Sequence, residues 1–379
     1  MSNPIQQVRI QLTTHFPERK QVIDGAISAV LAGEHVLLLG PPGTAKSALA
    51  RAIAQAFSGV YFERLLTKFS TPEELFGPVS LRALEQDKFS RVISGKLPEA
   101  EFSFIDEIFK ANSAILNSLL TLVNERVFHN DGLPTHCPLV TLFGASNELP
   151  EGKELEALFD RFLLRFDVGY LLRPANLKTV MLAPDPLPPT AMSMAELRKA
   201  QKETSAVKIT DATVDAVIAI REACAAEGII ASDRRWKKSL KLLQAAAYLA
   251  GAKETCPEDA ALLTDSLWRE PKERSKVARL VGKLADPVGS QAAEILDAAR
   301  ETALKVAAIK TGNDRKKYVS EAAQALEQFN QQQERLTKLG KSAGRRAKEV
   351  IADAVADVQA MHSDLARTIS AGLGLRSAK

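Results

Sequence analysis

The sequence is poor in cysteine and in aromatic residues. It has three cysteines, Cys137, Cys224 and Cys256, which are scattered along the chain and show no CxxC spacing. Disulfide frameworks and structural zinc sites both need paired or clustered ligands, so the sequence predicts neither, and the cysteine usage favours a reducing cytoplasm. Aromatic residues make up 6% of the chain, and they form no series of the kind that stacks nucleic-acid bases.

Long apolar segments are absent as well. Residues 1–16 contain no apolar core of the kind that a secretory signal requires. The longest apolar runs are far shorter than the ~20 residues that span a bilayer. We therefore expect no signal peptide, no membrane span and a cytoplasmic location.

A strong excess of one charge is also missing. The formal net charge is +4, which is too small to argue for nucleic acid as a partner. Residues 271–379 hold 20 basic and 13 acidic residues, so this tail is basic while the remainder is slightly acidic. The tail could contact an acidic partner, or it could be an ordinary solvated helical surface, and we prefer the second interpretation.

The apolar residues of the first half follow an alternating pattern of strands and helices. Short continuous apolar runs, typical of buried parallel strands, occur at residues 35–40, 102–105 and 139–146. Helical spacing of apolar residues occurs at residues 18–32, 47–57 and 113–125. An Asp-Gly pair within residues 127–134 predicts a β-hairpin. Residues 1–172 are therefore predicted to form an α/β domain with a doubly wound parallel sheet.

The rest of the chain is predicted to be helical. We interpret the proline-rich residues 173–209 as an interdomain linker, residues 210–285 as an all-α lid and residues 286–379 as a helical C-terminal region. Breaks at residues 311–314 and 340–344 divide the last region into three helices. Its apolar stripe recurs at close to a 3.5-residue period, at Ile351, Val355, Val358, Leu365 and Ile369. We expect a helical bundle with a docking or assembly role, the alternative being a flexible extension.

A loop of small residues follows the first predicted strand. It consists of Gly40, Pro41, Pro42, Gly43, Thr44, Ala45, Lys46 and Ser47. Backbone N–H groups of such a loop can surround phosphates, Lys46 can reach the β- and γ-phosphates, and the Ser47 hydroxyl can hold Mg²⁺. The strict phosphate-loop pattern has glycine where this chain has Ala45, and we expect alanine to be tolerated if that position is helical. The alternative is a chance Gly/Pro turn.

Polar residues also follow the second and third predicted strands. Asp106 and Glu107 come directly after residues 102–105, at the edge where the phosphate loop is expected. Asp106 would hold Mg²⁺ through its water shell, and Glu107 would act as the general base for an attacking water. Asn147 could orient that water. The alternatives are an exposed strand end for the acids and an Asx turn before Pro150 for Asn147.

Together these segments resemble one protein family. GPPGTAKS, FIDEI, GASNELP, LEALFDRFLLRF and SDRRWKKSLKLLQ are similar to the MoxR branch of the AAA+ ATPases, over about residues 15–270. Within that branch the RavA group is the most similar, through residues 67–80 and 94–108. Where the RavA group continues into a β-rich domain, this chain has a helical, basic region.

The resemblance implies a Mg²⁺-dependent ATPase that forms a homo-oligomeric, hexameric ring. Such rings act as chaperones on partner proteins, often with a protein that carries a von Willebrand factor A domain. By position, Lys46 and Ser47 fall in the Walker A motif, Asp106 and Glu107 in Walker B, and Asn147 at sensor 1.

The resemblance also implies roles for arginines. Arg161 falls in the box of the arginine finger, with Arg165 as the second candidate. Arg234 falls in the sensor 2 motif and would contact the γ-phosphate, with Arg235 as the alternative. Guanidinium groups suit this role because they neutralise the charge of the phosphoryl-transfer transition state. Without the resemblance, these residues would be interpreted as surface arginines of amphipathic helices.

Three functions are compatible with these features. The preferred one is an ATP-driven motor that remodels a partner protein. The second is a nucleic-acid motor or loader, against which stand the missing zinc motif, aromatic series and dense basic stripe. The third is a helical scaffold with a vestigial nucleotide site, against which stand Lys46, Asp106, Glu107 and Asn147.

Overall fold

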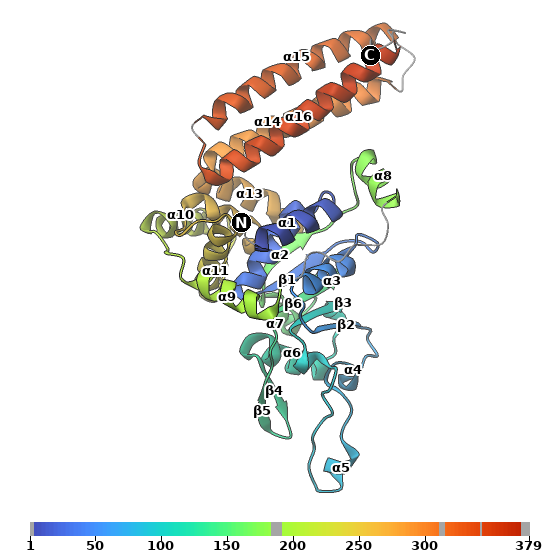
Figure 1. The fold of residues 1–379 in the computed structure, drawn as a ribbon, viewed down its shortest axis with the longest axis vertical. Helices are drawn as coiled ribbons and strands as arrows, with labels where there is room; N and C mark the ends of the chain where they lie inside the picture. Colours follow the sequence, from blue (N-terminus) through green and yellow to red (C-terminus); the bar gives the residue numbers. More distant parts are fainter. Residues whose placement is uncertain (1–3, 183–191, 311–314, 342, 373–379) are drawn as a thin grey trace. The chain divides into compact units, whose positions relative to one another are not determined.

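The computed structural model describes residues 4–182, 192–310, 315–341 and 343–372 (Figure 1). The chain forms two compact units. The first comprises Met1–Thr210, Ile229–Thr255 and Leu262–Arg274, and the second Asp211–Gly228, Cys256–Ala261 and Ser275–Lys379. No helix within these described ranges is long and apolar enough to cross a membrane.

The first unit is built on a five-stranded parallel sheet with the strand order β2-β3-β6-β1-β7. The strands are β1 (His35–Leu39), β2 (Tyr61–Leu65), β3 (Phe102–Asp106), β6 (Thr141–Ser146) and β7 (Phe162–Asp167). The predicted fold class is confirmed, and the three predicted strands are the three central ones. The two edge strands were not predicted, because β2 carries Glu63 and Arg64 and is largely exposed, whereas Arg165 interrupts the apolar run of β7.

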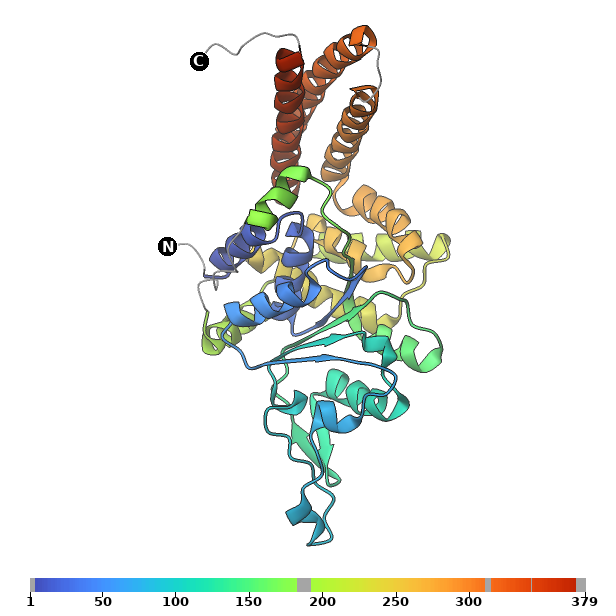
Figure 2. The same cartoon turned by 90° about the vertical axis from the view of Figure 1, so that its right-hand side faces the viewer.

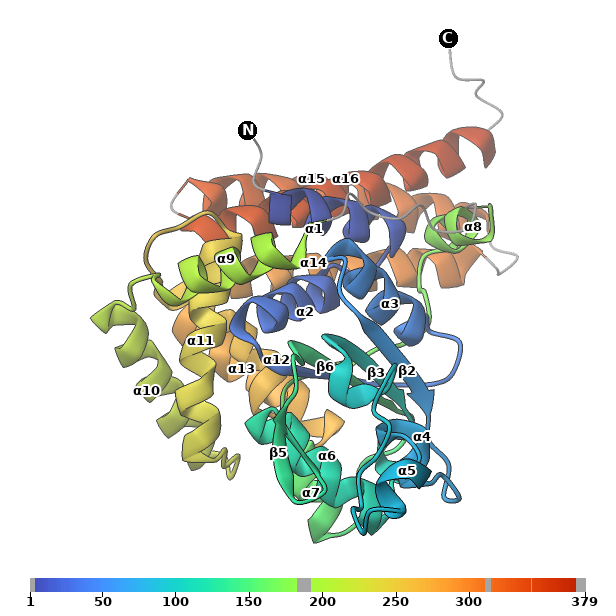
Figure 3. The ribbon, with the colours of Figure 1, turned by 60° about the horizontal axis from the view of Figure 1, so that its bottom comes forward.

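Helices cover both faces of this sheet, as a parallel sheet requires. In Figure 3, α2 and α3 lie over one face, and α6 and α7 lie on the other. The helices of the unit are α1 (Pro4–His15), α2 (Lys20–Ala32), α3 (Lys46–Ala56), α4 (Pro72–Phe76), α5 (Leu81–Leu84), α6 (Ser113–Glu125), α7 (Lys153–Phe159), α8 (Pro174–Leu182), α9 (Met194–Ser205), α11 (Asp233–Leu249) and α12 (Thr264–Leu267), with the 3-10 turns η1 (Leu97–Glu99) and η2 (Ile108–Lys110). Buried residues of α1, α2, α3, α9 and α11 form one core with the strands.

Part of the segment interpreted as a linker is an integral element of the first unit. Helix α9 begins with a capping box in which the Ser193 side chain accepts from the Glu196 N–H and the Glu196 carboxylate accepts from the Ser193 N–H. Leu197 and Ala200 are buried in the core cluster. The linker interpretation is therefore wrong for α9, and the Ser-x-x-Glu sequence was the signal of a helix start. Residues 183–191 lie outside the described residues.

The expected hairpin is confirmed. Strands β4 (Val127–Asn130) and β5 (Leu133–His136) pair antiparallel. Asp131 and Gly132 have φ of 54° and 73°, as the two central residues of a type I′ turn require. The segment that carries α5 projects from the sheet beside this hairpin (Figure 2), and the Phe89 N–H donates to the Asp131 carboxylate at 2.8 Å.

The C-terminal part of the second unit is a three-helix bundle. Its helices α14 (Pro287–Lys310), α15 (Arg315–Gly340) and α16 (Arg345–Gly372) pack on one another side by side (Figure 1). The predicted apolar stripe faces the bundle core, where Ile351 and Val358 are buried and Val355, Leu365 and Ile369 pack against them. The predicted break at residues 340–344 is confirmed, and the one at 311–314 lies outside the described residues. The unit also contains α10 (Asp211–Ala226); η3 (Pro257–Leu263) and α13 (Pro271–Ala285) belong in part to each unit.

A buried histidine fixes the start of β1. The Nδ1 atom of His35 accepts from the Leu142 N–H at 2.9 Å, and its Nε2 atom faces the Val123 carbonyl oxygen at 3.0 Å. Burial, together with the neighbouring cation of Arg126, holds the pKa of His35 well below its usual value. A second ring proton would point at the Leu142 N–H, so the folded protein keeps this imidazole neutral.

Acid should therefore destabilise the protein through His35. The unfolded chain gains a proton at a pKa near 6.5, whereas the folded chain does not, so stability is lost as the pH falls below that value, by about 1.4 kcal/mol per pH unit. The His35→Gln variant keeps an acceptor and a donor and should lose this part of the pH dependence. Urea unfolding between pH 7.5 and 5.5 measures the difference. His129→Gln, at an exposed position, is the control, and an equal pH slope in the wild type and His35→Gln would contradict the prediction.

Candidate functional site

The loop after β1 is constrained from both sides by the sheet. The Gly40 N–H donates to the Ser146 carbonyl at 3.1 Å, and the Val168 N–H donates to the Leu39 carbonyl at 2.7 Å. A Cβ atom on Gly40 would lie 2.3 Å from the Val168 oxygen, so only glycine fits here. Gly40 and Gly43 both have positive φ, at 138° and 78°, which curls the loop over the start of α3.

Ala45 adopts a conformation that the sequence analysis did not anticipate. Its φ and ψ are 65° and 25°, in the left-handed region, and α3 begins only at Lys46. The condition under which alanine was expected to be tolerated, a helical conformation at this position, is therefore not met. A residue with a Cβ atom pays roughly 1–2 kcal/mol in this region, which explains why the strict motif has glycine there.

Lys46 lies inside the loop with its charge directed at the loop's own carbonyls. Its side chain is 9% exposed, and Nζ donates to the oxygens of Gly40 and Pro41, both at 2.8 Å. Burial lowers the pKa of Lys46, and the negative charges of Asp106 and Glu107 oppose that shift. The fold thus brings the phosphate-loop cation into the electrostatic range of both predicted acids.

The two acids stand at the carboxyl end of β3. Asp106 is the last residue of the strand, and its Oδ1 atom accepts from the Glu107 N–H at 3.0 Å. Glu107 has a positive φ of 52°, and its carboxylate lies 3.2 Å from the Lys110 ammonium. Both acids are half-buried. Ser47 and Asp106 supply hydroxyl and carboxylate oxygens, which are the hard donors that suit Mg²⁺.

Asn147 follows the strand that separates the loop from the acids. Strand β6 pairs with β1 on one side, Ser146 opposite Leu39, and with β3 on the other, Gly144 opposite Ile105. Asn147 is exposed at that edge. The local turn is made by the Ser146 hydroxyl, which accepts from the Glu148 N–H at 3.1 Å and donates to its carbonyl at 2.8 Å. The predicted position between loop and acids agrees with this strand order.

The four candidate arginines fall into two pairs, and the first pair, Arg165 and Arg235, is buried. Arg165 is 2% exposed. It donates to the Trp268 carbonyl at 2.5 Å, and its guanidinium carbon lies 3.8 Å from the centroid of the Phe159 ring. Burial holds its pKa well below the usual arginine value. Arg165 is therefore a packed core residue.

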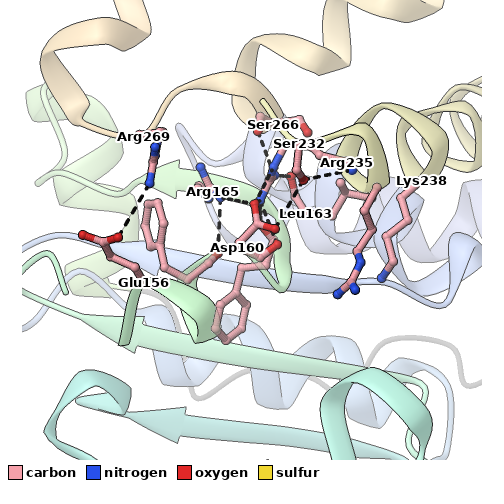
Figure 4. A network of polar contacts seen from close by, with 12 residues as sticks. Glu156, Asp160, Leu163, Arg165, Ser232, Arg235, Lys238, Ser266 and Arg269 are labelled. Atoms are coloured by element: carbon pink, nitrogen blue, oxygen red, sulfur yellow. Dashed lines mark hydrogen bonds and ion pairs between the residues drawn. The ribbon is translucent and has the colours of Figure 1, made fainter. Parts of the chain in front are cut away.

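Arg235 is the other buried arginine, with 3% exposure. It extends from the first turn of α11, which Ser232 caps. Its guanidinium Nη2 contacts the Asp160 carboxylate at 3.2 Å (Figure 4). The same group donates to four main-chain carbonyls, those of Asp160, Phe162, Leu163 and Ser266, at distances from 2.8 to 3.0 Å.

Arg161 and Arg234 form the outer pair. Arg161 is half-buried and Arg234 is exposed. Burial lowers the pKa of Arg161, and the positive charge of Arg234 lowers it further, so the two cations are within electrostatic range of each other. The buried Nε atom of Arg161 has no hydrogen-bond partner among the described atoms. Arg234 donates to the Asn124 side chain at 3.4 Å.

Asp160 is the residue whose importance sequence reasoning missed. It is named in the Asp-Arg-Phe box, but only the folded structure shows that it contacts Arg235, with Arg165 at 3.9 Å. No local pattern signals the contact with Arg235, because the two residues are 75 positions apart in the sequence.

A parallel sheet that carries a phosphate loop on one central strand and an acid pair on another defines the class of P-loop nucleotide-binding proteins. Comparison with known proteins gives the family. The profile described as "MoxR domain in the MoxR-vWA-beta-propeller ternary systems" matches residues 3–204, and the profile of an AAA lid domain matches residues 212–281. The chain belongs to the MoxR family of AAA+ ATPases.

The chain is also similar to individual known proteins. An uncharacterized protein of Methanocaldococcus jannaschii is 44% identical over 284 residues, which cover 74% of this chain and 76% of the relative. The chaperone MoxR1 of Mycobacterium tuberculosis is 26% identical over 207 residues, 53% of this chain and 54% of that protein. A crystal structure of a candidate ATPase of Cytophaga hutchinsonii superimposes with a TM-score of 0.60 at 19% identity, covering 74% of this chain and 93% of that one.

Replacing Ala45 with glycine should stabilise the protein. Glycine removes the left-handed penalty of roughly 1–2 kcal/mol but costs roughly 0.5–1 kcal/mol in unfolded-state entropy, so the expected gain is about 0.5–1 kcal/mol. Denaturant unfolding measures it. Ala48→Gly is the control, because this exposed residue lies in the right-handed part of α3 and should lose about 1 kcal/mol. If Ala45→Gly and Ala48→Gly lowered the free energy of unfolding equally, the left-handed conformation of Ala45 would be contradicted.

Proposed function

We propose that this protein hydrolyses ATP with Mg²⁺ in a ring of identical subunits and uses the energy to remodel a partner protein. The observation that supports the proposal best is the convergence of Lys46 with Asp106 and Glu107 at the carboxyl edge of the sheet. The arrangement combines a cation for phosphates with a nearby carboxylate that can act as a proton acceptor, and hydrolysis requires both.

The residues of the loop and of β3 have distinct proposed roles. The N–H groups from Gly40 to Ala45 bind the phosphates, and Lys46 neutralises the β- and γ-phosphates. Ser47 and Asp106 hold the metal ion, which supplies positive charge on the phosphate oxygens when it is bound. When a nucleotide binds, the Lys46 ammonium must give up its hydrogen bonds to the Gly40 and Pro41 carbonyl oxygens and donate to phosphate oxygens in their place.

Two further residues act on the water. Glu107 accepts its proton, and for this its carboxylate must leave the Lys110 ammonium at 3.2 Å and turn to the water. Asn147, at the end of the intervening strand β6, orients the same water with its amide. The proton acceptor and the amide stand on neighbouring strands, which fixes their separation.

Arg161 and Arg234 are proposed to act together on the nucleotide of a neighbouring subunit. Burial lowers the pKa of Arg161, and the positive charge of Arg234 lowers it further, so the two guanidinium groups are within electrostatic range of each other. Two adjacent cations, one with an unpartnered Nε atom, are poised for a polyanion between them. Burial leaves the alternatives Arg165 and Arg235 with structural roles. A finger acting in trans requires a ring, and six subunits is the number that the family resemblance suggests.

The partner is proposed to carry a von Willebrand factor A domain. Support comes from the matched family profile, whose description names such systems. A cytoplasmic location and the likeness to the RavA group stay predictions.

Replacing the general base should separate binding from chemistry. Glu107→Gln keeps the shape and hydrogen-bonding capacity of the side chain but cannot accept a proton, so turnover should fall by about 10²–10⁴-fold while ATP binding is kept. Lys46→Ala should weaken ATP binding itself. Fluorescent-nucleotide titration and phosphate release measure the two effects, with and without single-stranded DNA. Near-normal turnover in Glu107→Gln would show that another residue is the general base. Stimulation of ATP turnover by single-stranded DNA would favour a nucleic-acid motor.

Mixing variants should reveal the action in trans. Arg161→Ala and Lys46→Ala subunits, each inactive alone, should regain turnover when mixed, because some interfaces join an intact loop to an intact finger. The control is Glu107→Gln mixed with Lys46→Ala, since both lesions lie in the same half of the site and no interface is complete. Phosphate release is followed against the mixing ratio, with mixed assembly checked by mass spectrometry. Mixed rings without recovery would show that Arg161 is not the finger.

A further inference from the structure

Each outer arginine is the direct chain neighbour of a residue in the buried ion pair. Arg161 follows Asp160, and Arg234 precedes Arg235. Asp160 ends helix α7, and Arg235 lies in the first turn of α11, about 75 positions further along the chain. The contact between Asp160 and Arg235 at 3.2 Å is therefore a side-chain link between the two backbone segments that carry the outer arginines.

The link is unusually well supplied with hydrogen bonds. Besides the carboxylate of Asp160, the Arg235 guanidinium holds the carbonyl oxygens of Asp160, Phe162 and Leu163, all within the segment that carries Arg161. Ser232 adds a second connection, because its hydroxyl accepts from the Arg235 N–H at 3.3 Å and donates to the Asp160 carboxylate at 3.4 Å. A buried guanidinium with this many acceptors has one position available to it.

The outer arginines need such a link because they repel each other. Both are cations, and the positive charge of Arg234 acts directly on Arg161. The contact between Asp160 and Arg235 holds the segments that carry these two like charges close to each other. The carboxylate of Asp160, shared with Arg235, supplies the negative charge that offsets this repulsion.

We propose that Arg235 is a positioning residue, which sets the separation of Arg161 and Arg234 through its contact with Asp160 so that both enter one nucleotide site together. The proposal rests on the function proposed above for the two outer arginines. Because Arg235 and Arg234 are consecutive, any shift of the Arg235 guanidinium against Asp160 carries the Arg234 backbone with it. A misplacement of about 1 Å at a charge that stabilises the transition state can cost about 10²-fold in rate.

A second ion pair of α11 offers a matched control. One turn further along the helix, Lys238 contacts Glu34 at 2.6 Å, and Glu34 is buried with 4% of its side chain exposed. This pair also fastens α11 to the first unit, but neither of its residues adjoins an outer arginine. If the Asp160–Arg235 pair served only to anchor α11, disrupting either ion pair should change the effect of Arg234→Ala on turnover in the same way.

The test is a double-mutant cycle on turnover. Arg235→Lys keeps the charge but loses the planar, multiply bonded group, and it is combined with Arg234→Ala. Turnover in Arg235→Lys should fall by about tenfold or more, with ATP affinity and assembly unchanged. In that background, Arg234→Ala should cost less than about threefold, because residues that act as a unit are not additive. In the Lys238→Met background, Arg234→Ala should keep its full wild-type effect.

Asp160→Glu provides a second test that keeps the charge and lengthens the side chain by one methylene. In the Asp160→Glu background, Arg234→Ala should again have a reduced effect on turnover, and this result can be obtained even if Arg235→Lys folds poorly. If both variants lower the unfolding temperature while Arg234→Ala retains its full effect in each, Arg235 is structural only and the proposal is overturned. If Arg234→Ala leaves wild-type turnover unchanged, the role proposed for Arg234 is itself wrong. This result is distinct from the failure of the Arg235 proposal, because Arg234→Ala then has no effect on turnover that an Arg235 or Asp160 variant could reduce.

Discussion

The parallel pairing of β3, β6 and β1 is the constraint on which the site depends. Helices cover both faces of these strands, so the strands are buried almost throughout and the side chains of the proposed site stand at their carboxyl ends or just beyond them. Because parallel strands end at one edge, the phosphate loop, Asn147 and the acid pair arrive there together. The register of β1, β6 and β3 places the ends of the three strands side by side. The parallel pairing of β1 with β7 likewise brings Gly40 close to the backbone of Val168.

Burial divides the arginines more clearly than sequence position does. Arg161 and Arg165 are four residues apart, and Arg234 and Arg235 are adjacent. Nevertheless Arg165 and Arg235 are in the core, whereas Arg161 and Arg234 are not. Taking a guanidinium out of water is costly unless its donors are satisfied, and Arg235 meets this condition with carbonyl oxygens and Asp160. The arginines that remain outside are the ones able to meet an anion.

The two motifs of the proposed nucleotide site share strained backbone. Ala45 and Glu107 both have positive φ, at 65° and 52°. Non-glycine residues in this region cost free energy and persist where the surrounding structure holds them. Here the strands fix the preceding residues and the following helical turns fix the next ones. The strain falls where the loop meets α3 and where the acid pair leaves β3, so it sets the direction of Lys46 and of the Glu107 side chain.

The sequence by itself determined the central strands, the hairpin, the C-terminal helices and the residues of the phosphate loop and acid pair. These signals are local: continuous apolar runs, an Asp-Gly turn, a 3.5-residue stripe and fixed motif spacing. Tertiary structure decided the edge strands β2 and β7, because an edge strand tolerates charge and a buried arginine conceals a strand. It also decided the inclusion of α9 in the core and the left-handed conformation of Ala45. Above all it decided which arginine faces outward, since that depends on Asp160 meeting Arg235 across about 75 residues of chain, and no local pattern encodes such a contact.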